Sequence, residues 1–130
     1  MKKLLTLAVL LSTSAHAITT QQVVTAFQRA GLEAKSPTAI TRDGYGMAPL
    51  VGKGVRFLIP SLGEDSGGRV FDVPNAGQRS KLAGYYTALG EESAALYSHV
   101  FVHRNIVVQI NGELSDARAA RYKAALMKLR

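Results

Sequence analysis

The chain has 130 residues, with 16 lysines and arginines against 9 aspartates and glutamates, which gives a net charge of +7. This length suits a single domain that buries its own core. The sequence contains no cysteine, which excludes disulfides, cysteine nucleophiles and cysteine-based zinc sites.

Residues 1–17 have the three parts of a secretory signal peptide. Lys2 and Lys3 give a positive start, Leu4 to Leu11 form an apolar run, and Ala15-His16-Ala17 is a small-x-small cleavage site. The apolar run is far shorter than the roughly 20 residues needed to span a bilayer. We expect cleavage near Ala17 and export of residues 18–130 to the periplasm or the cell exterior; an amphipathic or buried first helix is the alternative.

The first half of the mature chain predicts one helix and two or three strands. Thr19 and Gln22 have capping-box spacing, and apolar residues at helical spacing follow, which predicts a helix over 20–30 that stops at Gly31. A weak strand candidate over 33–42 is interrupted by Pro37. The glycine-rich stretch 43–54 reads as a loop. Strands are expected at 55–59 and 69–73.

The register of these two strands can be predicted from their side chains. Placing Phe57 opposite Phe71 clusters two aromatic rings and sets Arg56 opposite Asp72, whereas a one-residue slip would set Phe57 opposite Asp72. We therefore expect a hairpin with Phe57 facing Phe71, connected by the sequence SLGEDSGG.

The second half predicts a helix, a hairpin and a last helix. Asn75 caps a helix that Gly90 ends, and strands at 98–103 and 106–110 turn around Arg104-Asn105. Ser115 caps the last helix. The expected fold is α+β, with an antiparallel sheet of four or five strands in two hairpins, three helices, and the order α-(β)-β-β-α-β-β-α. The expected core residues are Phe57, Phe71, Val73, Phe101, Val108 and Ile110.

The stretch Glu64-Asp65-Ser66-Gly67-Gly68 resembles the way trypsin-like proteases present their active serine. A serine nucleophile needs a base and a group that orients the base. The histidines left after cleavage, His99 and His103, both follow Ser66, which is the reverse of the protease order. Asp-Ser-Gly-Gly is also favourable turn chemistry, so we interpret the segment as a hairpin turn and expect no catalytic residue here.

Two further motifs predict no nucleotide or metal site. Residues 46–54, GMAPLVGKG, lack both the spacing and the hydroxyl of a phosphate-binding loop, and a strand follows them instead of a helix. On a strand, His99 and His103 would share a face but lie about 13 Å apart, too far for one ion. We expect no cofactor and no metal.

Three sets of residues are candidates for contact with a partner. The loop offers Tyr45, Met47 and Lys53. The last helix carries Arg118, Arg121, Lys123 and Lys128, which could touch phosphates or anionic lipid, or could simply cover the apolar edge of the helix. The second hairpin looks apolar on both faces, so its Val100, Val102 and Val107 face is either covered by helices or is an interface, for which dimerisation would suffice.

The mature chain resembles a group of short exported bacterial proteins of uncharacterised function. The resemblance lies in VVTAFQRAGL, GVRFLIPS, YYTALG and SHVFVHRNIVVQING. It implies one exported α+β domain and carries no activity. The leading hypothesis is a non-catalytic binding or interaction module of the bacterial cell envelope. The alternative is a basic domain that binds a polyanion (nucleic acid, acidic envelope polymer or anionic lipid) through the last helix; an enzyme would need a pocket that joins a histidine to a carboxylate and a hydroxyl.

Overall fold

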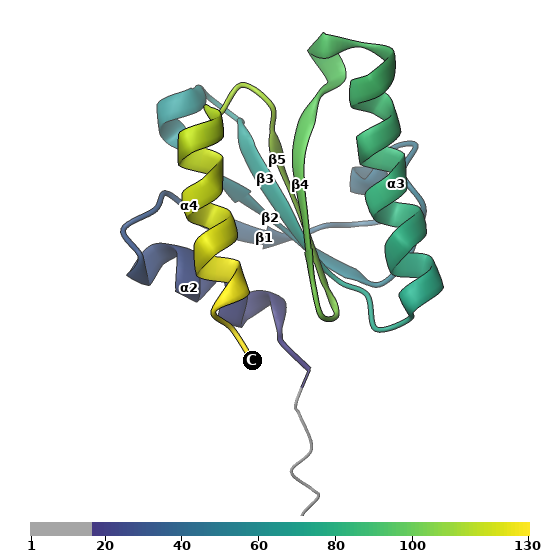
Figure 1. Ribbon diagram of the computed structural model, residues 1–130, viewed down its shortest axis with the longest axis horizontal. Coiled ribbons are helices and arrows are strands. Elements are labelled where there is room, and N and C mark those ends of the chain that lie inside the picture. The colour runs from purple at the N-terminus through teal and green to yellow at the C-terminus, as the bar shows by residue number, and fades with distance from the viewer. Residues whose placement is uncertain (1–16) are drawn as a thin grey trace, which may run out of the picture.

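The computed structural model describes residues 17–130, so the predicted signal peptide, apart from Ala17, lies outside the described residues. Within residues 17–130, three α-helices and a five-stranded antiparallel sheet form an α+β fold (Figure 1), as the sequence predicts. The weak strand candidate is a real strand, so the order is α-β-β-β-α-β-β-α. Among the helices of residues 17–130, none combines the length and the apolar character needed to cross a bilayer.

The three predicted helix caps are confirmed. The side chains of Thr19, Asn75 and Ser115 each accept a hydrogen bond from a backbone N–H in the first turn of their helix, and Thr19 forms a complete capping box with Gln22. Gly90 does not end its helix, which runs two residues further and closes at Ser93. The helices are α2 (Thr20–Arg29), α3 (Ala76–Glu92) and α4 (Asp116–Met127).

The sheet has the strand order β1-β2-β3-β5-β4, and all neighbours are antiparallel. The last two strands form the predicted hairpin, in which His103 pairs with Ile106 and Arg104 takes a φ of 55°. Positive φ is unusual for arginine. Here it allows the β4–β5 turn to consist of only two residues, Arg104 and Asn105. The strands are β1 (Lys35–Ala39), β2 (Lys53–Leu58), β3 (Gly67–Asp72), β4 (Ser98–His103) and β5 (Ile106–Asn111).

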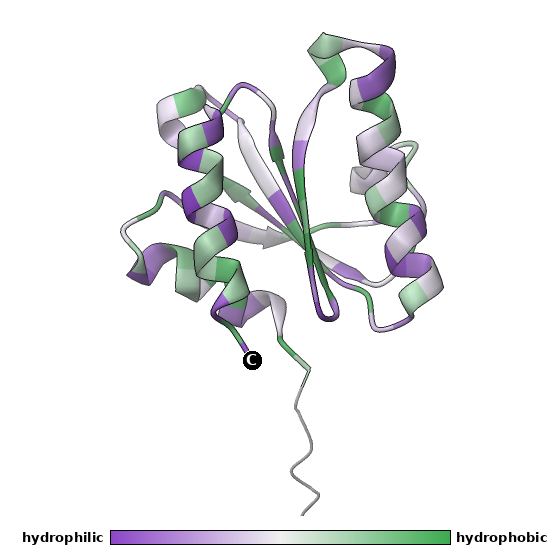
Figure 2. Cartoon of the chain, viewed as in Figure 1, coloured by the Kyte–Doolittle hydropathy of each residue, from purple (hydrophilic) through white to green (hydrophobic). Residues whose placement is uncertain are grey.

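Helices cover both faces of the sheet. Helices α2 and α4 lie on one face and α3 lies on the other (Figure 1). The larger core cluster gathers Phe27, Phe57 and Tyr122 beneath α2 and α4, and the smaller one gathers Phe71 and Tyr86 beneath α3. Figure 2 shows hydrophobic strand residues between the two helical layers. Of the expected core residues only Phe101 is not fully buried, and it packs against the edge of the larger cluster.

The predicted register between β2 and β3 is wrong by three residues. Phe57 pairs with Gly68, and Phe71 pairs with Gly54. The two phenylalanines therefore point to opposite faces, one into each core cluster. The physical reason is that Gly67 and Gly68 are strand residues and not turn residues. A Cβ on Gly68 would lie 2.7 Å from the Phe57 ring, so the glycine provides the space that this ring fills.

Candidate functional site: a polar groove on the sheet

Helix α3 covers only part of its face of the sheet. Gly54, Phe71 and Val107 pair across β2, β3 and β5, and both apolar side chains are buried in the smaller core cluster. Two residues further along each strand, the same face carries Arg56, Arg69 and Gln109, because side chains alternate with a period of two. Apolar residues thus give way to polar ones along this face, on which α3 packs mainly over β4 and β5.

This polar part of the face forms an open groove of about 600 Å³, which we call the sheet groove. Strand β1 and the following residues Ile40 and Thr41 line one side, and the short 3₁₀ helix Ala94–Leu96 with Tyr97 lines the other. The floor comes from the three central strands. The polar lining residues are Thr38, Thr41, Arg56, Asp65, Ser66, Arg69, Tyr97, Ser98, Gln109 and Asn111.

The floor is crossed by one continuous row of paired residues. Thr38 pairs with Arg56, Arg56 with Arg69, Arg69 with Gln109, and Gln109 with Val100. Directly opposite residues of antiparallel strands project from the same face, with Cβ atoms about 4.5–5.5 Å apart. The two arginine side chains therefore start side by side on the floor of the groove.

Gln109 fixes one of the two arginines. Arg69 Nη1 donates to Gln109 Oε1 at 2.8 Å, and Gln109 Nε2 donates to Ser98 Oγ at 2.9 Å. Gln109 is only 6% exposed, and each half of its amide has a partner. A buried amide held at both ends has one orientation, so Arg69 is pre-positioned. Within residues 17–130 no carboxylate lies within ion-pair distance of Arg69.

Arg56 is held more loosely by the loop between β2 and β3. Its Nη2 donates to the Asp65 carbonyl at 3.0 Å, and the Asp65 carboxylate lies 4.0 Å away and is 84% exposed. An exposed pair of this length contributes little. The floor thus carries two guanidinium groups and one weakly engaged carboxylate, an arrangement suited to a ligand with carboxylate or phosphate groups.

Ser66 lines the sheet groove, but both histidines lie on the other face. His99 pairs with Ile110, which belongs to the core beneath α2 and α4, and its Nε2 lies 2.6 Å from the Leu114 carbonyl oxygen. His103 Nε2 lies 2.7 Å from the Leu129 carbonyl oxygen. The histidines join β4 to the segments around α4 and offer no base to Ser66. No group of three potential metal-ligating side chains occurs within the described part of the chain.

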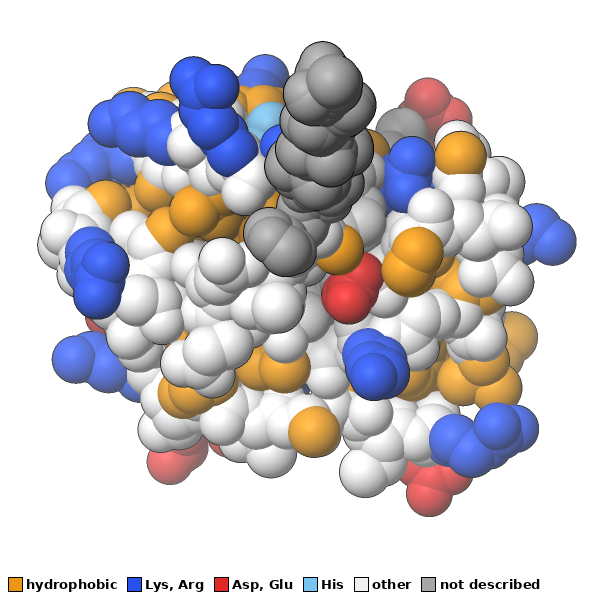
Figure 3. Space-filling model, turned by 90° about the horizontal axis from the view of Figure 1, so that it is seen from below, with side chains coloured by type: hydrophobic (Ala, Val, Ile, Leu, Met, Phe, Trp, Pro, Cys, Tyr) orange, Lys and Arg blue, Asp and Glu red, His pale blue; other side chains and the backbone are white. Residues whose placement is uncertain are grey.

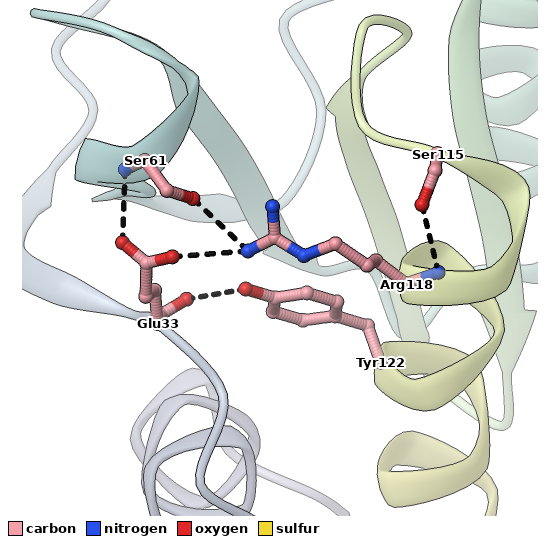
Figure 4. A network of polar contacts seen from close by, with 5 residues as sticks. All are labelled: Glu33, Ser61, Ser115, Arg118 and Tyr122. Atoms are coloured by element: carbon pink, nitrogen blue, oxygen red, sulfur yellow. Dashed lines mark hydrogen bonds and ion pairs between the residues drawn. The ribbon is translucent and has the colours of Figure 1, made fainter.

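Two of the four basic residues proposed on the last helix have structural contacts. Arg118 Nη2 donates to Glu33 Oε2 at 2.9 Å and to Ser61 Oγ at 3.0 Å, and Tyr122 donates to the Glu33 carbonyl (Figure 4). Hydrogen bonds from Ser61, with the Arg118 charge, hold the pKa of Glu33 below its ordinary value. Lys123 Nζ lies 6.0 Å from the centre of the Phe101 ring.

The other two, Arg121 and Lys128, line an apolar depression between α2 and α4. Its volume is about 390 Å³, and Arg29 lies at its rim as well. Seen from below, hydrophobic side chains gather between lysines and arginines on this side of the molecule (Figure 3). The depression is a second basic surface, separate from the sheet groove. Its apolar lining residues are Ala26, Ala30, Leu32, Ala124, Ala125 and Leu129.

The loop candidates do not form a site together. Tyr45 braces the loop, since its hydroxyl donates to the Val51 carbonyl at 3.1 Å and its ring lies 5.6 Å from that of Phe71; burial raises its pKa. Met47 is 89% exposed. Lys53 is exposed at the start of β2, opposite Asp72.

The apolar face of the second hairpin is mostly covered. Val107 is fully buried, and Val100 packs against the same cluster beneath α3. Only Val102 remains 44% exposed. Of the two alternatives that the sequence left open, helical cover is the one observed, which removes the main support for an interface at this hairpin.

Sequence reasoning missed the sheet groove because of the register. The predicted register set Arg56 against Asp72, whereas the structure sets Arg56 against Arg69. The available signal was the Gly67-Gly68 pair, because two glycines in a strand fit opposite the two bulky residues Phe57 and Leu58. Comparisons with protein-family models, with curated proteins and with solved structures found no match.

Proposed function

We propose that residues 18–130 are an exported, non-catalytic binding module of the bacterial cell envelope, which holds an anionic ligand in the sheet groove. Export to the periplasm or the cell exterior rests on the predicted signal peptide and on the resemblance to short exported proteins. The assignment as a binding module is supported by a groove that combines fixed hydrogen-bonding groups with excess positive charge.

The observation that carries the proposal is the pairing of Arg56 with Arg69 on the floor of the groove. Like charges directly opposite each other destabilise a sheet. A bound anion turns that repulsion into two attractions, because a carboxylate or phosphate accepts hydrogen bonds from both guanidinium groups. The buried Gln109 holds one of them in place before the ligand arrives, which lowers the entropy lost on binding.

The shape of the groove favours an extended ligand. The groove reaches from β1 across the sheet to the Ala94–Leu96 turn, so a linear chain can lie along the row of floor residues. Tyr97 at the far side is 47% exposed, and an aromatic ring of this kind can pack against a sugar ring. Ser98 and Asn111 add hydroxyl and amide groups. The ligand class that fits is a segment of an acidic polymer, with an acidic polysaccharide as the best match.

A second candidate ligand site is the depression between α2 and α4. There Arg29, Arg121 and Lys128 surround an apolar lining, which favours an anion that carries apolar groups, such as anionic lipid. This is the part of the polyanion hypothesis that the contacts of the last helix still support, since Arg118 and Lys123 have partners within the fold.

The test compares two charge-matched variants of the mature domain. Arg56→Gln/Arg69→Gln removes two positive charges from the sheet groove, and Arg121→Gln/Lys128→Gln removes two from the depression. Binding of fluorescent oligogalacturonate, polyphosphate, neutral dextran and anionic vesicles is measured by anisotropy or sedimentation at about 50 and 200 mM salt. We expect the first variant to lose at least about tenfold in affinity for an acidic oligomer, equivalent to about 1.4 kcal/mol.

The pattern of affinity losses shows whether the ligand binds in the sheet groove or in the α2–α4 depression. Equal losses in both variants would mean that net charge dominates and would contradict a specific groove. Loss only in the Arg121→Gln/Lys128→Gln variant, together with binding to vesicles, would move the function to the α2–α4 depression. Comparable affinity for neutral dextran would exclude charge recognition. Circular dichroism of both variants checks that the fold is retained.

A further inference from the structure

The described chain enters the core at Ile18. This residue is 1% exposed and belongs to the larger core cluster, whereas Ala17 directly before it is exposed. The predicted signal-peptide cleavage site lies between the same two residues. The boundary of the folded domain and the expected processing point therefore coincide, although one comes from packing and the other from the sequence pattern.

A buried polar cluster surrounds the backbone of Ile18. Asn105 accepts from the Ile18 N–H with its side-chain oxygen at 3.1 Å, and donates with its side-chain nitrogen to the Ile18 carbonyl at 2.7 Å. The same nitrogen lies 2.7 Å from Asp72 Oδ1. Asn105 is 9% exposed, one of three buried polar residues among those described.

The fold fixes Asn105 from both sides. It is the second residue of the β4–β5 turn, directly after Arg104 with its positive φ, and its own carbonyl accepts from the Val73 N–H at 2.7 Å. The turn therefore aims one amide side chain at the N–H and the C=O of a single residue 87 positions earlier. Packing of the chain start against a hairpin does not require one side chain to bind both backbone groups of the same residue.

We propose that Asn105 and Asp72 form a receptor for a new N-terminus, the α-ammonium group of Ile18. This rests on the export part of the proposed function and not on the ligand of the sheet groove. A peptidase adds water across the Ala17–Ile18 peptide bond, so that Ala17 leaves with a carboxylate and Ile18 gains an ammonium group. One of its N–H groups takes the place of the amide donor to Asn105. The Asp72 carboxylate, held at the other end of the same Asn105 side-chain amide, supplies the countercharge.

The cluster meets the two requirements for holding such a charge. A partly buried ammonium is costly unless it has acceptors and a countercharge, and here Asn105 supplies the acceptor while Asp72 supplies the negative charge. Hydrogen bonds from a charged donor are also stronger than those from an amide. Lys53 on the neighbouring strand β2 pairs with Asp72, but its side chain is exposed. Processing thereby joins the start of α2 to the tip of the hairpin more firmly.

The experiment compares two chains that differ by one residue and that both contain every described helix and strand. One starts at Ile18, released from a removable fusion that leaves no extra residue. The other starts at Ala17, so its amine lies on an exposed residue while Ile18 keeps its amide N–H. Acetylation of the α-amine by a succinimide ester is followed by peptide mass spectrometry, in buffer and in urea.

For the Ile18 chain we expect folding to slow acetylation by about tenfold or more relative to urea, because the amine must first leave its site. For the Ala17 chain we expect less than about a twofold change. Asp72→Asn should speed the reaction in the Ile18 chain alone. Equal folding effects in the two chains, or no effect of Asp72→Asn on the Ile18 chain, would overturn the proposal.

Terminal sequencing of the protein recovered from an exporting bacterial host separates this proposal from the others. A start at Ile18 supports it. A start at another residue overturns the receptor but leaves export standing, and an uncleaved, retained chain overturns both. None of these results alters the affinity of the sheet groove for an acidic oligomer, which the charge-matched variants measure independently.

Discussion

Arg56 and Arg69 lie directly opposite each other on β2 and β3 and project from the same face of the sheet. Only Asp65, on the connecting loop, comes within 4.0 Å of either guanidinium group among the described carboxylates, and it is exposed. A sheet tolerates such a pair at a cost. An anionic ligand bound between the two arginines would offset this repulsion.

Arg56→Gln should raise stability at low salt while it weakens ligand binding. Removal of one charge relieves the repulsion, by about 0.3 kcal/mol for a partly exposed pair. The gain should shrink as salt screens the charges, and thermal melts at low and high salt measure it. Arg56→Lys keeps the charge and serves as the control. Because both substitutions remove the guanidinium hydrogen bond to the Asp65 carbonyl, an Arg56→Gln variant less stable than Arg56→Lys at low salt would show that the pair does not repel.

Gln109→Leu should destabilise the domain by about 1–2 kcal/mol, because it leaves the half-buried Arg69 and Ser98 without their shared partner. Ser98→Ala should cost less, since Arg69 keeps its acceptor. Urea denaturation compares the two variants. If Gln109→Leu were as stable as the parent, the amide would be a passive filler and Arg69 would not be pre-positioned.

Two glycine-to-alanine substitutions should act in opposite directions. At Gly68 a Cβ would lie 2.7 Å from the Gln109 carbonyl and from the Phe57 ring, so Gly68→Ala should cost about 1–3 kcal/mol through overpacking. At Gly84, inside α3, a Cβ would meet nothing within 4 Å, so Gly84→Ala should gain up to about 1 kcal/mol from helix propensity. Chemical denaturation tests both; a harmless Gly68→Ala would contradict the tight contact at this register position.

Glu33 should make its full contribution to stability only above its ordinary pKa of 4.5. Its folded-state pKa is lowered by the Ser61 hydrogen bonds and by Arg118, so the stabilisation is present at neutral pH and is lost as the pH falls below 4.5 through the lowered value. Glu33→Gln should cost less than about 1 kcal/mol at pH 7, since solvent reaches the pair. The difference from the parent in urea midpoint should narrow toward pH 3; a constant difference would contradict this account.

The sequence carries most of the secondary structure in local signals. Thr19, Asn75 and Ser115 are capping residues whose effect depends on the next turn of chain alone, and all three caps are found. The helix stop predicted at Gly90 is wrong, since α3 continues to Glu92. Gly90 instead leaves room for Tyr97, whose ring would lie 3.0 Å from a Cβ at this position. Local rules cannot anticipate a neighbour supplied by the following segment.

The candidate site was hidden because it depends on pairing between strands. Phe57 opposite Phe71 satisfied cross-strand preferences, but a sheet with helices on both faces can bury one ring on each side. Gly68, read as a turn residue, in fact accommodates the Phe57 ring. Once these contacts set the register, Arg56 pairs with Arg69. No sequence motif indicates this pairing.

The most direct test of the central claim is a titration of ¹⁵N-labelled Ile18–Arg130 with oligogalacturonate, followed by amide chemical shifts. Binding in the sheet groove predicts that the largest shifts gather on Arg56, Arg69, Gln109 and Ser98, with Arg121 and Lys128 unchanged. Shifts centred on the α2–α4 depression, or spread evenly over the basic surface, would contradict it.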